Sequence, residues 1–191
     1  MAKDWPKIKA RHSNRVSPWL SIIERTVEFT PNGKIELYHA VDQQDYIAMV
    51  AVLPDGRMPI VRQYRPALES FTWELPAGLV DDDEAPLTSC RRELLEETGF
   101  AAHAVYPLGT YAPCTSRLSN RVHSFYVETG PTPERETIEP GLELMLVSPT
   151  QLAMLITKGE FVLQLHIGAL LLAGIHGYLD LKAFLAINQE S

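Results

Sequence analysis

The segment from Gly78 to Phe100, GLVDDDEAPLTSCRRELLEETGF, constrains the fold most strongly because it predicts an amphipathic helix with two unlike faces. At about 100° per residue, three glutamates fall in one sector, and the apolar side chains form a second sector whose centre lies roughly 120° or more away. The glutamates are Glu93, Glu96 and Glu97, and the apolar residues are Leu87, Cys90, Leu94 and Leu95. Clustered carboxylates repel one another unless a cation lies among them, and hard divalent cations bind such oxygen-only clusters. The pattern predicts that one face packs while the other binds metal.

The sequence also predicts where this helix begins and ends. Pro86 is acceptable at the first helical position, and Gly99 suits the left-handed residue that ends a helix. Ala85 stands where a capping Ser, Thr or Asp would be expected. We expect a helix from Pro86 to Thr98 without a side-chain cap.

Charge and cysteine content narrow the class of protein. Seventeen basic against 24 acidic residues give a formal net charge of −7. This balance argues against a nucleic-acid partner. Two cysteines, Cys90 and Cys114, provide neither a disulfide framework nor zinc spacing. We therefore expect a cytoplasmic protein with free thiols.

No segment predicts a membrane partner. The N-terminus is basic but lacks the apolar core of a signal peptide. The most apolar stretch, residues 165–187, is interrupted by His166, His176, Asp180 and Lys182. It predicts a buried or interface helix, and the two histidines are interpreted as packed or interface residues.

Strand and turn signals divide the chain into two expected domains. Residues 19–41 form two β-type runs around Pro31-Asn32-Gly33, which predicts an N-terminal β-hairpin subdomain over residues 1–43. Residues 44–191 form the second domain. Its expected strands begin at Tyr46, Met58 and Phe71 before the central helix and at Ala104, Arg121 and Leu142 after it, with helices over 149–158 and 163–187. Strands on both sides of a central helix predict an α/β sandwich.

A family resemblance rests on the spacing inside the central segment. An acidic run alone is more often a solvated helix face. Here Gly78, Glu84, the pair Arg92-Glu93, the pair Glu96-Glu97 and Gly99 stand at the spacing of the Nudix box. Seven fixed positions at typical residue usage make a chance match on the order of one in ten million. The chain therefore resembles a Nudix hydrolase, which implies a Nudix-type α/β/α sandwich.

The resemblance implies a metal site. Glu93 and Glu97 should be primary ligands of Mg²⁺, for which Mn²⁺ would substitute, with Glu96 bound directly or through water. The backbone carbonyl of Ala77 also ligates metal in similar enzymes. Arg92 is expected to organise the glutamates and to support catalysis, with a purely structural salt bridge as the alternative.

The segment before the Nudix box indicates which class of substrate the chain would bind. VRQYRPALESFTWELPAG, residues 61–78, resembles the corresponding segment of ADP-ribose and ADP-sugar pyrophosphatases. Arg62 and Arg65 are three residues apart, so on a strand they point to opposite faces. We favour Arg65 as the ligand of the phosphates or terminal ribose and keep Arg62 as second, with a surface arginine as the alternative. Glu74 is a weaker candidate for a substrate or metal contact.

Two further residues are predicted from the same subgroup. Trp19 resembles an N-terminal tryptophan region in which a swapped strand lines the partner's site, so it would stack on adenine in a homodimer, or simply pack in the hairpin. The general base is expected on the loop 131–144. Glu139 is our first choice, followed by Glu136 and Glu143, although a loop glutamate is more often merely solvated.

These features predict Mg²⁺-dependent hydrolysis of the diphosphate of ADP-ribose or an ADP-sugar, giving AMP and a sugar phosphate. A GDP-sugar, NADH or a dinucleoside polyphosphate remains open as the nucleoside diphosphate substrate. A non-catalytic module that binds a nucleotide or a protein is the second class. The complete set of glutamates with Arg92 disfavours that class, because binding alone would not require it.

Overall fold

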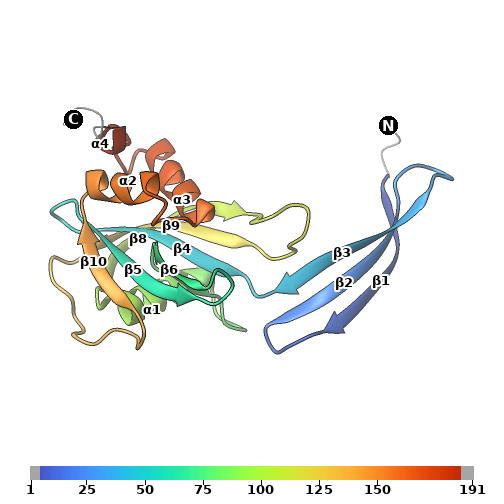
Figure 1. Ribbon diagram of the computed structural model, residues 1–191, viewed down its shortest axis with the longest axis horizontal. Helices are drawn as coiled ribbons and strands as arrows, with labels where there is room; N and C mark the ends of the chain where they lie inside the picture. Colours follow the sequence, from blue (N-terminus) through green and yellow to red (C-terminus); the bar gives the residue numbers. More distant parts are fainter. Residues whose placement is uncertain (1–4, 186–191) are drawn as a thin grey trace. The chain divides into compact units, whose positions relative to one another are not determined.

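The computed structural model describes residues 5–185, which form two compact units (Figure 1). The first unit comprises residues 5–45 and the segment Ala112–Arg121, and the second comprises Tyr46–Tyr111 and residues 122–185. No helix among the described residues is both long and apolar enough to cross a membrane.

The first unit is an antiparallel sheet in the order β1-β2-β3, with β1 at Lys7–Arg15, β2 at Leu20–Glu28 and β3 at Ile35–Gln43. The predicted turn joins β2 to β3, where the Gly33 N–H donates to Thr30 O over 2.9 Å. The structure adds β1, whose charged sequence KIKARHSNR has apolar side chains only at Ile8 and Ala10. Residues 112–121, which the sequence assigns to the second domain, instead bond to β3 of the first unit, where the Val41 N–H donates to Arg117 O over 2.7 Å.

The second unit contains two sheets. One has the order β7-β4-β9-β8 and the other the order β10-β5-β6. β4 and β9 are parallel, and the other neighbouring pairs are antiparallel. The strands are β4 Tyr46–Val52, β5 Met58–Arg65, β6 Ser70–Glu74, β7 Ala77–Leu79, β8 Ala102–Tyr111, β9 Val122–Thr129 and β10 Glu143–Val147.

Helices cover both faces of these sheets (Figure 1). They are α1 Pro86–Thr98, α2 Pro149–Thr157, α3 Gln164–Ile175 and α4 Lys182–Leu185. On β4, Met49 packs with Cys90 and Leu94 of α1, while Val50 belongs to the core that includes Leu152 and Leu170 of α2 and α3. Successive strand residues point to opposite faces, so one strand serves two cores. The predicted α/β/α sandwich is confirmed.

Two predicted elements are divided in the structure. The helix expected over 163–187 ends at Ile175, because Gly177 adopts a left-handed conformation with φ 79° and the Tyr178 N–H turns back to Ala173 O. Residues 186 and 187 of that prediction lie outside the described residues. The single strand expected from Phe71 is divided into β6 and β7, and the chain crosses between the two sheets at Leu75 and Pro76.

Candidate functional site

The central helix has the predicted limits. α1 begins at Pro86 after an Ala85 that makes no side-chain cap, and it ends at Gly99, whose φ is 76° and whose N–H donates to Leu95 O over 3.0 Å. Helical periodicity turns Glu93 and Glu96 about 60° and 120° away from Cys90, whereas Glu97 lies only about 20° from Cys90, at the border of the apolar face. The acidic face is therefore presented by a helix that its apolar face anchors in the core.

Arg92 lies among the carboxylates. Its Nη1 donates to Glu93 Oε1 over 2.8 Å and to Glu96 Oε2 over 3.2 Å, and its Nη2 donates to Glu84 Oε2 over 2.9 Å. Glu84 also accepts from Ser89 Oγ over 2.7 Å, which fastens the preceding loop to the first turn of the helix. The guanidinium holds the pKa of Glu84 below its usual value. Arg92 thus occupies the position expected of an organiser.

Gly78 permits the approach of Glu93 to β7. A Cβ atom at position 78 would overlap the Glu93 carboxylate, so a larger residue there would displace it. Burial raises the pKa of Glu93, although Arg92 opposes the shift. Gly78 thus allows the Glu93 carboxylate to lie against the backbone of β7.

Glu97 is the most deeply placed of the three glutamates. It is 4% exposed, and its Oε2 accepts from the Ala77 N–H over 2.9 Å. Burial raises the pKa of Glu97 to about 8, with smaller contributions from the charges of Glu93 and Glu139. In the metal-free protein Glu97 therefore carries a proton at neutral pH, and a bound cation would replace that proton.

Arg65 lies near these glutamates and forms an ion pair with the buried Glu74. Its Nε donates to Glu74 Oε1 over 2.7 Å and its Nη2 to Glu74 Oε2 over 2.5 Å, while Thr72 Oγ1 donates to Glu74 over 2.6 Å. Glu74 is 2% exposed. Burial alone would raise the pKa of Glu74, but Arg65 and Thr72 hold it below its usual value. The charge of Arg65 also acts on Glu97, so the half-exposed guanidinium is close to the acidic face.

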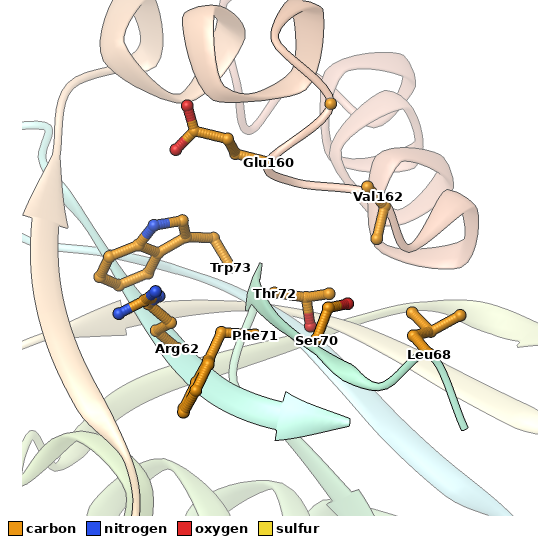
Figure 2. A pocket seen from close by; sticks show the side chains of 9 residues that line it. Arg62, Leu68, Ser70, Phe71, Thr72, Trp73, Glu160 and Val162 are labelled. Carbon is orange, nitrogen blue, oxygen red and sulfur yellow. The ribbon is translucent and has the colours of Figure 1, made fainter. Parts of the chain in front are cut away.

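Arg62 lies on the opposite face of β5, as the strand period predicts. It donates to both Glu143 oxygens over 3.2 Å and lies 4.7 Å above the Phe71 ring. It lines a hollow of about 530 Å³ with Trp73 and Glu160 among the other lining residues (Figure 2). The structure therefore brings Arg65, and not Arg62, to the glutamates, and it pairs the base candidate Glu143 with Arg62.

The loop that carries the other base candidates is bound to the end of α1. Gly99 O accepts from the N–H groups of Glu134 and Arg135 over 2.8 and 3.1 Å, and the Glu139 N–H donates to Glu96 O over 2.9 Å. These bonds place the Glu139 carboxylate close enough to raise the pKa values of Glu93 and Glu97. Glu139 is thus the loop glutamate whose charge raises the pKa values of both Glu93 and Glu97.

Trp19 belongs to the first unit and is 67% exposed. Its ring is therefore not packed into the hairpin, which was the alternative interpretation. Its relation to adenine remains a prediction.

The comparisons with known proteins agree with this geometry. A NUDIX domain model matches residues 43–164, which include every predicted site residue except Trp19. The chain belongs to the Nudix family. An ADP-ribose pyrophosphatase of Mycobacterium tuberculosis is 34% identical over 149 residues, 74% of this chain and 70% of that protein. An ADP-ribose pyrophosphatase of Bacillus subtilis is 33% identical over 98 residues, 51% of this chain and 53% of that protein.

Not all of the similar proteins are named as ADP-ribose pyrophosphatases. A CMP-5'-(N-acetyl-N-hydroxy-3-aminopropyl)phosphonate hydrolase of Streptomyces rubellomurinus is 34% identical over 114 residues, 59% of this chain and 54% of that protein. The chain thus spans about half the length of several curated relatives. A solved structure described as an ADP compounds hydrolase has a TM-score of 0.75 at 22% identity and covers 94% of this chain and 100% of that chain. This likeness confirms the Nudix fold.

The carboxylates of the Nudix helix are not assembled as a metal cluster in this structure. Among residues 5–185, no group of three or more His, Cys, Asp or Glu side chains is arranged to hold an ion. Arg92 draws Glu93 and Glu96 toward its guanidinium, whereas Glu97 turns to the Ala77 N–H. Glu93 and Glu97, whose pKa values are raised by burial, still fit a divalent cation, because a cation would stabilise their ionised forms.

The sequence did not indicate how Arg65 is held. Thr72 and Glu74 point to the same face of β6 because they are two residues apart, and that period was a usable signal for their contact. The register that sets Arg65 opposite Ser70 also brings its side chain to Glu74. The docking of Glu134 and Arg135 on Gly99 had no comparable signal, because contacts between a loop and a helix end follow no period.

Gly99→Ala should lower both stability and turnover. A Cβ at this left-handed position would be strained and would also overlap Arg135 O, which displaces the loop that carries Glu139. Gly56→Ala is the matched control, because its φ is 84° and no atom lies within 4 Å of the added Cβ. Gly56→Ala should lose about 1 kcal/mol of unfolding free energy in urea titrations, and Gly99→Ala should lose more because of the overlap, but kcat should fall only for Gly99→Ala. Equal kcat values in the two variants would contradict the role of Gly99 in placing the loop.

Proposed function

We propose that this chain hydrolyses the diphosphate of ADP-ribose or a related ADP-sugar in a Mg²⁺-dependent reaction that gives AMP and a sugar phosphate. The observation that carries the proposal is the grouping of Arg65 with the part-buried Glu93, the buried Glu97 and the loop residue Glu139. This group combines the half-exposed Arg65 guanidinium, for phosphate, with carboxylates for metal and for proton transfer. The names of several relatives, ADP-ribose or ADP-sugar pyrophosphatase, support the substrate.

The metal would be held by carboxylates and one backbone oxygen. Glu93 and Glu97 would be its direct ligands, together with the Ala77 carbonyl, and Glu96 would bind directly or through water. Bound there, Mg²⁺, or Mn²⁺ in its place, supplies positive charge to the phosphoryl oxygens and lowers the pKa of water. Arg92 would keep Glu93 and Glu96 ionised and oriented while the site is empty.

The remaining steps belong to the side chains of this chain. Arg65 binds the phosphates, and Glu74 fixes the guanidinium so that little ordering is needed on binding. Glu139 accepts a proton from the attacking water, whose oxygen forms a bond to one phosphorus of the diphosphate. The bond from that phosphorus to the bridging oxygen breaks, and the bridging oxygen leaves with the other phosphate.

We also propose a cytoplasmic homodimer that forms through the N-terminal domain, residues 1–43, with Trp19 of one protomer reaching the adenine site of its partner. Exposed apolar side chains on β3, Ile35 and Leu37, support an interface in this region. Sedimentation equilibrium of the full chain tests the assembly. Twice 21.4 kDa is expected, and a monomer at micromolar concentration would contradict the dimer.

A substrate panel tests the proposed activity. ADP-ribose, ADP-glucose, a GDP-sugar, NADH and a dinucleoside polyphosphate are each incubated with Mg²⁺ at neutral and alkaline pH, and the released nucleoside monophosphate is measured. ADP-ribose or an ADP-sugar should have the highest kcat/KM. Turnover of another compound alone would reject the substrate, and no turnover at all would favour a binding module. The relative named methanol dehydrogenase activator, from Bacillus methanolicus, is 31% identical over 100 residues and gives that second class a specific basis.

Arg65→Gln should raise KM by roughly tenfold to a hundredfold, because it removes charge-assisted hydrogen bonds to the phosphates. Since this variant leaves Glu74 buried and unpaired, the double variant Arg65→Gln/Glu74→Gln should recover stability but not KM. Arg62→Gln is the matched control on the other face of β5, and its kinetics should stay near wild type. Steady-state kinetics checks all three variants. An equal rise of KM for Arg62→Gln would contradict the assignment.

A further inference from the structure

His166 is a buried polar side chain that has no role in the proposed reaction. Its imidazole is fully buried on α3, on the side of the sheets away from the Nudix helix, and lies near the Phe161 ring. Burial lowers the pKa of His166 to about 4, so the ring is neutral at neutral pH. An apolar side chain of similar size would fill the same space without the cost of desolvation.

The imidazole supplies one acceptor at a break in the sheets. Its Nδ1 accepts from the Leu75 N–H over 3.0 Å. Leu75 lies where the chain passes from β6 in one sheet to β7 in the other, and no described backbone carbonyl accepts from its N–H. A buried N–H without a partner is strongly unfavourable. His166 therefore completes the hydrogen bonding of the crossing point.

The choice of ring nitrogen shows what the position requires. Because Nδ1 accepts, the neutral ring carries its proton on Nε2. The buried Nε2 has no hydrogen-bond partner among the described residues. The ring thus provides an acceptor at Nδ1 while its Nε2–H stays without a partner among the described residues. Packing alone does not explain why a histidine, and not an apolar residue, stands at this position.

The residues on either side of Leu75 hold two parts of the proposed site. Glu74 precedes it and fixes Arg65, while Ala77 follows two residues later and donates to Glu97. Between them Pro76 O accepts from the Met49 N–H over 3.1 Å. The orientation of this short segment therefore sets the distance between the phosphate-binding guanidinium and the buried metal-site carboxylate.

We propose that His166 is a positioning residue: through the Leu75 N–H it fixes the crossing segment so that Arg65 and Glu97 keep their productive separation. This inference rests on the proposed function of the site. His166 touches neither substrate nor metal, and its effect passes through the backbone. Errors of about 1 Å in such placement can cost roughly a hundredfold in rate.

Two amide variants test the acceptor position with nearly the same chemistry. His166→Asn places its amide oxygen near the position of Nδ1, whereas His166→Gln carries the oxygen one bond farther out, near Nε2. His166→Asn should keep kcat/KM within about threefold of wild type, and His166→Gln should lose roughly tenfold to a hundredfold. His166→Phe, which has no acceptor, should resemble His166→Gln. Leu170→Ala, in the same core and on the same helix, controls for lost stability alone.

The measurements are kcat, KM and the Mg²⁺ concentration for half-maximal rate, with the unfolding free energy of each variant. Leu170→Ala should lose as much stability as His166→Gln but keep its kinetics. In the Arg65→Gln background, His166→Gln should add little to the rise of KM. Equal kinetics for the Asn and Gln variants, or equal losses of kcat/KM in Leu170→Ala and His166→Gln, would overturn the inference. If Arg65→Gln itself leaves KM unchanged, the proposed phosphate contact fails instead, and the two failures are thus distinguished.

Discussion

Glu97→Gln should lower kcat for ADP-ribose by about a hundredfold to a thousandfold, because it removes a negative charge that would bind the metal. The metal would stabilise the charge that develops on the phosphoryl oxygens. The amide keeps the size of the carboxyl group, and its oxygen can still accept from the Ala77 N–H. Glu160→Gln, an exposed glutamate on the other side of the sheets, is the matched control and should be unaffected. Equal turnover in Glu97→Gln and wild type would reject the metal assignment.

The same variant should change how stability depends on pH in the absence of metal. The folded state raises the pKa of Glu97 from 4.5 to about 8, so folding favours the protonated form. The stabilisation is complete below pH 4.5 and is lost as the pH rises toward 8. Glutamine does not ionise, so Glu97→Gln should be the more stable protein at pH 8 in EDTA and should differ less at pH 5. Urea unfolding at the two pH values measures this difference.

Glu139→Gln should lower kcat by about a hundredfold or more and leave KM near its wild-type value, because it removes the group that accepts a proton from water. Its backbone N–H would still donate to Glu96 O, so the loop should stay in place. Glu134→Gln and Glu136→Gln on the same exposed loop are the controls. If Glu136→Gln loses activity and Glu139→Gln keeps it, Glu136 becomes the base.

Local sequence patterns predicted the elements that carry the site. The limits of α1 follow from Pro86, Gly99 and a helical period that needs no distant contact. The opposite faces of Arg62 and Arg65 follow from the strand period in the same way. Such signals act within a few residues, and tertiary packing did not override them here.

Features that depend on long-range contacts were predicted poorly. β1 was missed because its charged residues show no buried face, and it forms by pairing with β2. The C-terminal helix was made too long because composition does not show that Gly177 takes a left-handed turn. The sequence also did not reveal the ion pair between Arg65 and Glu74. Nor did it reveal the hydrogen bond from the Leu75 N–H to His166, which joins residues 91 positions apart. These pairs join separate elements, so only their three-dimensional arrangement identifies them.

The release of AMP from ADP-ribose, measured during a Mg²⁺ titration after metal removal with EDTA, tests the central proposal most directly. We expect no turnover in EDTA, recovery as Mg²⁺ is added, and a lower Mg²⁺ requirement at higher pH because Glu97 must lose its proton to bind metal. Full turnover in EDTA, or no turnover at any Mg²⁺ concentration, would contradict it.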